Sequence, residues 1–187
     1  MSLENSPKPE NRLVDYPKNI ISYTGTEGGN ETIDQAYEAV AQKLETLKLA
    51  LSTGKTAIHK KMDTVVATSE TNDSFAVSTV VGIKISGAKN DLSSFIDQTV
   101  RNITNAQKTI RSGNPSQAEG ILSQSNIEVT VAFTESIANI RESADSAGLS
   151  DPTKMAMSSL ADLVATQKPT IERSFATQLD AVQKLTV

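Results

Sequence analysis

The stretch FAVSTVVGIKISGAK (residues 75–89) is the most apolar part of the chain, and its assignment decides the fold. Its β-branched Val and Ile residues favour a strand, whereas its two glycines weaken a helix. The stretch is too short to cross a bilayer, which takes a helix of about 20 residues. Three interpretations follow: one face of a helix, a strand, or a segment that contacts a membrane.

The residues after this stretch favour the helix, because apolar side chains recur there at spacings of three and four. These positions are Leu92, Ile96, Ile103, Ala106 and Ile110. The same spacing, continued backwards, falls on Ala88, Ile85, Val81 and Ser78. We therefore predict that residues 75–89 belong to a helix over about 74–112. Gly82, Ser86 and Gly87 would then either admit a neighbouring backbone or mark a segment that can rearrange.

The apolar residues of this stretch are also the candidates for a membrane-contacting or rearranging segment. They are Phe75, Val77, Val80, Val81, Ile83 and Ile85. Lys84 and Lys89 interrupt the segment, and no run of 18 uninterrupted apolar residues occurs in the chain. We therefore expect no transmembrane helix.

Three further segments have helical periodicity and recognisable ends. Thr32 and Gln35 form a capping-box pattern that predicts a helix over about 32–69, followed by a polar turn, SETNDS (residues 69–74). In SGNPSQ (112–117) and AGLSDP (147–152), a glycine that can end one helix precedes a capping residue and a proline. These signals predict helices over about 115–147 and 151–186.

Two of these helices contain a conflicting signal. IEVTVAF (residues 127–133) alternates with a period of two, as a strand does, although the wider pattern around it is helical. Pro169 lies inside the last helix, where it removes a backbone hydrogen bond. Because the apolar spacing keeps its phase across Pro169, we expect one bent helix, with two shorter helices as the alternative.

The predicted fold is all-α: an elongated up-down-up-down four-helix bundle with coiled-coil-like seams, over residues 31–187. A seam is here the stripe of apolar residues at spacings of three and four on one helix. Aromatic residues make up only 4% of the chain and Trp is absent, so slim aliphatic side chains must fill the core. Four segments of this length give rods of roughly 50 Å.

Residues 1–30 are predicted to form an extended N-terminal arm. Pro7, Pro9 and Pro17, followed by Gly25, Gly28 and Gly29, oppose a helix there. The arm also carries apolar side chains that a pure linker would not need, and we expect them to dock on a protein surface. These candidate interaction residues are Leu13, Val14, Tyr16, Ile20, Ile21 and Tyr23.

Residues with catalytic or ligand-binding chemistry are scarce. The chain has no Cys and one His, His59, which argues against a thiolate metal site and a Ser/His/Asp triad. Gly54, Lys55 and Thr56 resemble the end of a phosphate-binding loop, but Leu49 stands where that loop needs its first glycine. We therefore assign no catalytic, cofactor-binding or metal-binding residue, and we expect no enzyme activity and no cofactor.

These features together predict a non-enzymatic structural subunit of a large homo-oligomer, such as a virion, phage tail or filament component. The net charge of −4 and pI near 5.1 argue against a nucleic-acid partner. The N-terminus, MSLENSPKPENR, lacks the apolar core of a signal peptide, which favours a cytoplasmic or virion location. Two alternatives stay open: a secreted or membrane-active bundle, such as a toxin component or translocator, and an adaptor that binds a protein partner.

Overall fold

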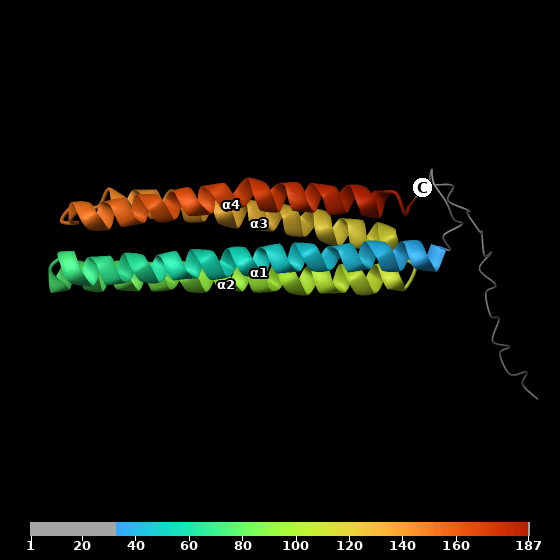
Figure 1. Cartoon of the computed structure of the whole chain (residues 1–187), viewed down its shortest axis with the longest axis horizontal. Coiled ribbons are helices and arrows are strands. Elements are labelled where there is room, and N and C mark those ends of the chain that lie inside the picture. Colours follow the sequence, from blue (N-terminus) through green and yellow to red (C-terminus); the bar gives the residue numbers. More distant parts are fainter. Residues whose placement is uncertain (1–32, 187) are drawn as a thin grey trace, which may run out of the picture.

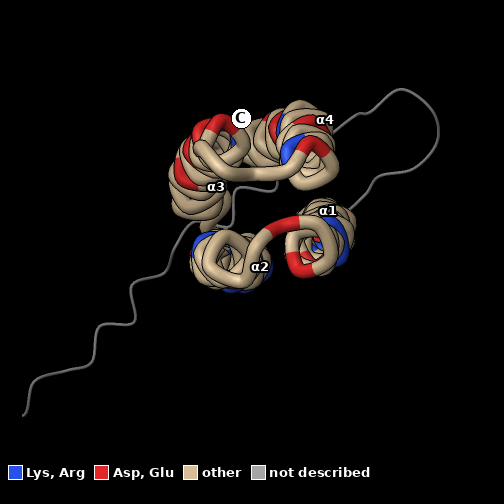
Figure 2. The backbone as a smooth tube through the Cα atoms, turned by 90° about the vertical axis from the view of Figure 1, so that its left-hand side faces the viewer, with Lys and Arg blue, Asp and Glu red and all other residues tan. Residues whose placement is uncertain are grey.

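The computed structural model describes residues 33–186, which form four helices joined by short turns (Figure 1). The helices are α1 (Ile33–Asn72), α2 (Phe75–Arg111), α3 (Pro115–Ala144) and α4 (Asp151–Gln183). α1 packs against α2 and α4, and α3 packs against the same two helices, so the four occupy the corners of a square (Figure 2). The predicted all-α four-helix bundle is confirmed. The predicted arm, residues 1–30, lies outside the described residues.

One apolar seam from each helix builds the core. In α1 the seam positions from Val40 to Val65 are buried, and in α4 the seam continues to Val182. The largest fully buried side chains are mostly aliphatic, and they include Phe133, Phe175, Leu44, Leu51, Ile58, Ile96 and Ile103. Narrow seams of this kind let the helices pack side by side along their whole length.

Residues 75–89 form the first part of α2, as the seam spacing predicts, and no strand occurs between residues 33 and 186. Val81 and Ile85 are buried in the core. The suggestion that the glycines admit a close backbone is wrong, because a Cβ atom on Gly82 or Gly87 would meet no atom within 4 Å. Within the described residues, none of the helices combines the length and apolar character that crossing a membrane requires.

The strand-like alternation of residues 127–133 has a simple origin in α3. Val129 and Phe133 belong to the buried seam, whereas Ile127 and Val131 are exposed on the opposite face. Each pair is spaced four residues apart, so each pair lies on one helix face. The two pairs interleave in the sequence and imitate a period of two.

The helix ends differ in detail from the predicted boundaries. α1 runs to Asn72, which reduces the turn predicted over residues 69–74 to Asp73 and Ser74. α2 and α3 are separated by Gly113, which has a positive φ of 81° that suits glycine, and Asn114 caps α3 by accepting a hydrogen bond from the Gln117 amide. α3 ends at Ala144, and α4 is one continuous helix through Pro169.

Candidate interaction surface at the turn end of the bundle

The turn end is here the end of the bundle that holds the α1–α2 turn and the α3–α4 loop. Asp73, in the first of these connections, accepts three hydrogen bonds of 2.7 Å: from the Ser69 hydroxyl, the Thr153 hydroxyl and the Ser150 amide. In a capping box, the third residue of a helix reaches back to the amide of the capping residue. Asp73 performs this role for α4 from another part of the chain. We call this arrangement the Asp73 clasp.

The charge of Asp73 is held in place by its donors. Burial tends to raise the pKa of Asp73, but the hydrogen bonds from Ser69, Thr153 and Ser150 outweigh it and hold the pKa far below its ordinary value. The ionised carboxylate therefore fixes the start of α4 against the α1–α2 turn.

Farther from the turn end, side chains of α1 and α2 pair across the interface at nearly every helical turn or two. The pairs, with their shortest distances, are Lys89–Asp63 (2.7 Å), Ser93–His59 (2.9 Å), Asp97–Lys55 (2.8 Å), Gln107–Glu45 (2.8 Å) and Arg111–Glu38 (2.8 Å). Exposed pairs of this kind contribute up to about 1 kcal/mol each. Their larger effect is to fix the register of the two helices.

His59 is the one titratable member of these pairs whose ordinary pKa lies near neutrality. Burial lowers the pKa of His59, and the positive charges of Lys89 and Lys55 lower it further, while Asp63 acts in the opposite direction. The imidazole lies 2.9 Å from the Ser93 hydroxyl, and no carboxylate of residues 34–186 lies at hydrogen-bonding distance from it. The neutral form of His59 is therefore favoured in the folded protein.

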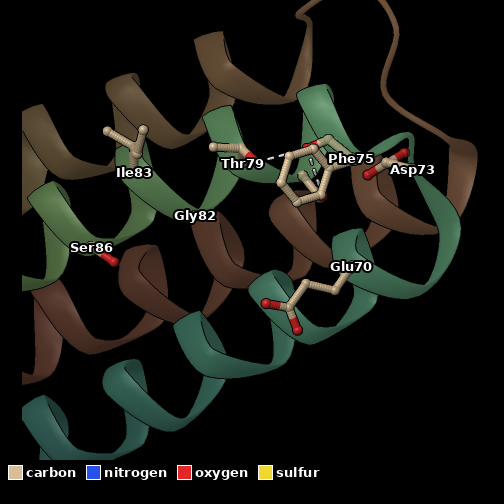
Figure 3. A pocket seen from close by; sticks show the side chains of 8 residues that line it. Glu70, Asp73, Phe75, Thr79, Gly82, Ile83 and Ser86 are labelled. Carbon is tan, nitrogen blue, oxygen red and sulfur yellow. Dashed lines mark hydrogen bonds between the residues drawn. The ribbon is translucent and has the colours of Figure 1, made fainter.

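Toward the turn end, the last of these cross-helix pairs is Lys89–Asp63. Among the described residues, no side chain from 75 to 88 forms a hydrogen bond or ion pair with α1. A groove of about 770 Å³ lies there instead, which we call the turn-end groove (Figure 3). Its lining residues are Glu70, Asp73, Phe75, Ser78, Thr79, Gly82, Ile83 and Ser86.

The turn end concentrates exposed apolar side chains. Phe75 is 87% exposed and Ile83 is 69% exposed, and both line the turn-end groove. Val80 and Met155 are also exposed, and they lie in the first turns of α2 and α4, which both begin at this end. The other large exposed apolar side chains in residues 34–186 lie farther along the helices, at Leu49, Phe95, Ile127 and Val131.

The turn end is also acidic. Residues 70–83 and 142–153 contain no Lys, Arg or His, whereas Lys84 and Lys154 directly follow these two ranges, and acidic residues are visible in red at this end in Figure 2. These acids are Glu70, Asp73, Glu142, Asp145 and Asp151. The combination of exposed apolar side chains with nearby carboxylates favours a partner that is apolar and carries positive charge.

The structure divides the candidate segment of residues 75–85. Val81 and Ile85 are core residues and Val77 is packed against the core, whereas Phe75, Val80 and Ile83 face outward. The arm candidates, Leu13, Val14, Tyr16, Ile20, Ile21 and Tyr23, lie outside the described residues. Sequence reasoning missed Glu70, Asp73 and Met155 as parts of this surface. An Asp immediately before the capping Ser74 was the available signal for Asp73.

The Gly-Lys-Thr sequence that resembles a phosphate-binding loop does not form a loop. Gly54, Lys55 and Thr56 lie within α1, and a Cβ atom on Gly54 would lie 3.4 Å from the Gln167 side chain of α4. A smaller groove of about 370 Å³ lies beside this contact, between α1 and α4. Within residues 33–186, His, Asp and Glu side chains form no group of three that could hold a metal ion.

Comparisons of the chain with protein-family models, with curated proteins and with solved structures gave no match.

Proposed function

We propose that the protein is a structural subunit that assembles with copies of itself, and that the turn-end surface is one of its contacts. The observation that carries this proposal is the exposure of Phe75 and Ile83 along one groove, about two helical turns apart on α2 with Thr79 between them (Figure 3). Burying a large apolar side chain stabilises a complex by roughly 1.5–3 kcal/mol before ordering costs. A groove with two exposed apolar side chains at the end of a rod offers this gain to a second molecule.

The shape of the bundle supports assembly into an extended structure. α2 has 37 residues, which corresponds to a rod of roughly 55 Å. A contact between the turn end of one copy and a different surface of the next can repeat from copy to copy, so it builds a linear array or a ring. More specifically, we propose that the protein is a component of a virion, a tail or a filament.

Light scattering after size-exclusion chromatography tests the proposal on the full-length chain. We expect a mass above the 20.0 kDa of one chain, rising with concentration. The double variant Phe75→Ser with Ile83→Ser is expected to shift the mass toward one chain with unchanged helicity. The matched control is Leu49→Ser, because Leu49 is also exposed but lies far from the turn end. A wild-type mass of one chain at every concentration contradicts the proposal.

Lipid is the second candidate partner, because Phe75, Val80 and Ile83 all face outward from the start of α2. The acidic residues of the turn end oppose this candidate for membranes with anionic headgroups. Flotation with zwitterionic and anionic vesicles separates the two candidates. Self-assembly predicts that the protein stays in the lipid-free fraction with both vesicle types, and flotation with either would favour lipid.

A further inference from the structure

We propose that the turn-end groove binds the arm segment YPKNIISY (residues 16–23) of a second copy of the chain, so that copies join head to tail. This inference rests on the proposed function, because it requires self-assembly, and it names the two surfaces that meet. The two surfaces lie on the same chain but at different places, so each copy can give an arm and receive one.

The length of the chain excludes residues 21–23, the last three of this segment, from the groove of its own bundle. Ser86, at the near edge of the groove, is roughly 38 Å along α2 from Arg111. Arg111 pairs with Glu38, which lies about 8 Å from the start of α1. The groove therefore extends from roughly 45 Å to roughly 60 Å from Ile33.

The arm cannot cover that distance with Ile21 and Tyr23. Tyr23 precedes Ile33 by ten residues, which reach at most about 35 Å when fully extended. Ile21 reaches at most about 42 Å under the same limit. The backbone of each of these two residues falls short of the near edge of the groove in its own bundle, and in the proposed contact a second copy supplies them.

The chemistry of the segment matches the groove. Residues 16–23 contain Ile20, Ile21 and two tyrosines, with Lys18 as the single charged side chain. The groove offers Phe75 and Ile83 for apolar contact, and Gly82 between them leaves open space where another residue would place a side chain.

The charges are complementary as well. Glu70 lies on the α1 side of the groove (Figure 3), and within the described residues it forms no ion pair. Asp73 already accepts three hydrogen bonds, so Glu70 is the carboxylate available to the Lys18 ammonium. An ion pair at the edge of the groove would orient the segment without requiring a buried charge.

A mixing experiment with two variants of the full chain tests this arrangement. The arm variant, Ile20→Ser with Ile21→Ser, keeps an intact groove, and the groove variant, Ile83→Glu, keeps an intact arm. We expect each variant alone to have the mass of one chain and unchanged helicity by circular dichroism. An equal mixture has one working contact, so we expect a heterodimer of twice 20.0 kDa and nothing larger.

The outcomes separate this inference from the proposed function. A wild-type chain that stays monomeric overturns both. Wild-type assembly that survives in the arm variant, or a mixture that stays monomeric, overturns the arm-in-groove contact and leaves self-assembly standing.

Disulfide capture gives a second test, because the chain has no Cys of its own. Tyr23→Cys in one chain and Ile83→Cys in another are expected to form a covalent heterodimer under mild oxidation. The control pairs Tyr23→Cys with Leu49→Cys, which is similarly exposed but outside the turn-end groove. Equal yields from the two pairs would overturn the proposal.

Discussion

The two halves of α2 present the same face to the core and different faces to the solvent. Val81 and Ile85 in the first half, and Ile96 and Ile103 in the second, belong to one buried seam. Outside the seam, the second half exposes one large apolar side chain, Phe95, and carries polar and charged side chains that pair with α1, such as Asp97 with Lys55. The first half instead exposes Phe75, Val80 and Ile83 beside a groove. The buried seam determines the fold and is the same in both halves. The outer face differs, and only in the first half does it leave a groove that a partner can occupy.

The largest expected effect is on the free energy of unfolding, when an isoleucine is replaced by aspartate in each half of α2. Ile96→Asp places a charge in the core, where Ile96 is only 1% exposed, and we expect the free energy of unfolding to fall by about 3–5 kcal/mol. Ile83→Asp, at an exposed position, is expected to change it by less than about 0.5 kcal/mol. Urea unfolding followed by circular dichroism measures both. Equal losses of unfolding free energy in the two variants would show that Ile83 is buried as deeply as Ile96.

The Asp73 clasp joins the turn that precedes α2 to the start of α4, and its removal is the next largest effect. Asp73→Ala leaves the Ser69, Ser150 and Thr153 donors without their acceptor. A hydrogen bond to a charged group contributes about 1.5–3 kcal/mol, and partial exposure of the turn reduces the total, so we expect a loss of about 2 kcal/mol. Asp145→Ala at the same end is the control, with an expected change within about 0.5 kcal/mol.

The clasp also predicts a pH dependence. The pKa of Asp73 is lowered in the folded state, so its stabilisation is present above the unfolded pKa of about 3.9 and is lost as pH falls through the lower folded value. The difference in unfolding free energy between the wild type and Asp73→Ala should therefore shrink below about pH 4. A difference that stays constant into strong acid would show that the charge of Asp73 contributes nothing.

Replacing Gly82 or Gly87 with alanine tests whether the first half of α2 needs its glycines. A Cβ atom on Gly82 or Gly87 meets open space, so alanine should raise the free energy of unfolding by about 0.5–1 kcal/mol at each position. Gly54→Ala is the comparison, because its Cβ atom would lie 3.4 Å from Gln167 and we expect a smaller gain. Thermal unfolding measures all three. A destabilised Gly82→Ala would mean that this position needs glycine.

The smallest effect concerns His59, at the first cross-helix pairs after the groove. Its folded pKa is lowered, so the folded state binds the proton less well than the unfolded chain, and stability decreases slightly as pH falls through about 6.5. Lys89→Met should raise the pKa of His59, whereas Lys43→Met, far along α1, should not. An NMR titration of the single histidine reports this directly. No change in Lys89→Met would show that Lys89 does not act on His59.

Local patterns in the sequence were sufficient for the fold but not for the turn end. Seam spacing and the glycines at 113 and 148 predicted the four helices, because those signals act over a few residues. The Asp73 clasp joins Asp73 to Ser150 and Thr153, which follow it in the sequence by 77 and 80 positions. No local pattern encodes contacts over that separation. The turn-end groove likewise depends on how α1 and α2 are aligned. The six candidate residues from Phe75 to Ile85 were grouped by hydrophobicity, which does not distinguish the core face from the outer face.

The central claim is that copies of the chain join through the arm of one and the turn-end groove of another. The most direct measurement is the light-scattering mass of a chain that lacks residues 1–30, compared at equal concentration with the full chain. The account predicts that the shortened chain has the mass of one bundle and unchanged helicity per residue, while the full chain assembles. A shortened chain that assembles as the full chain does would contradict the account.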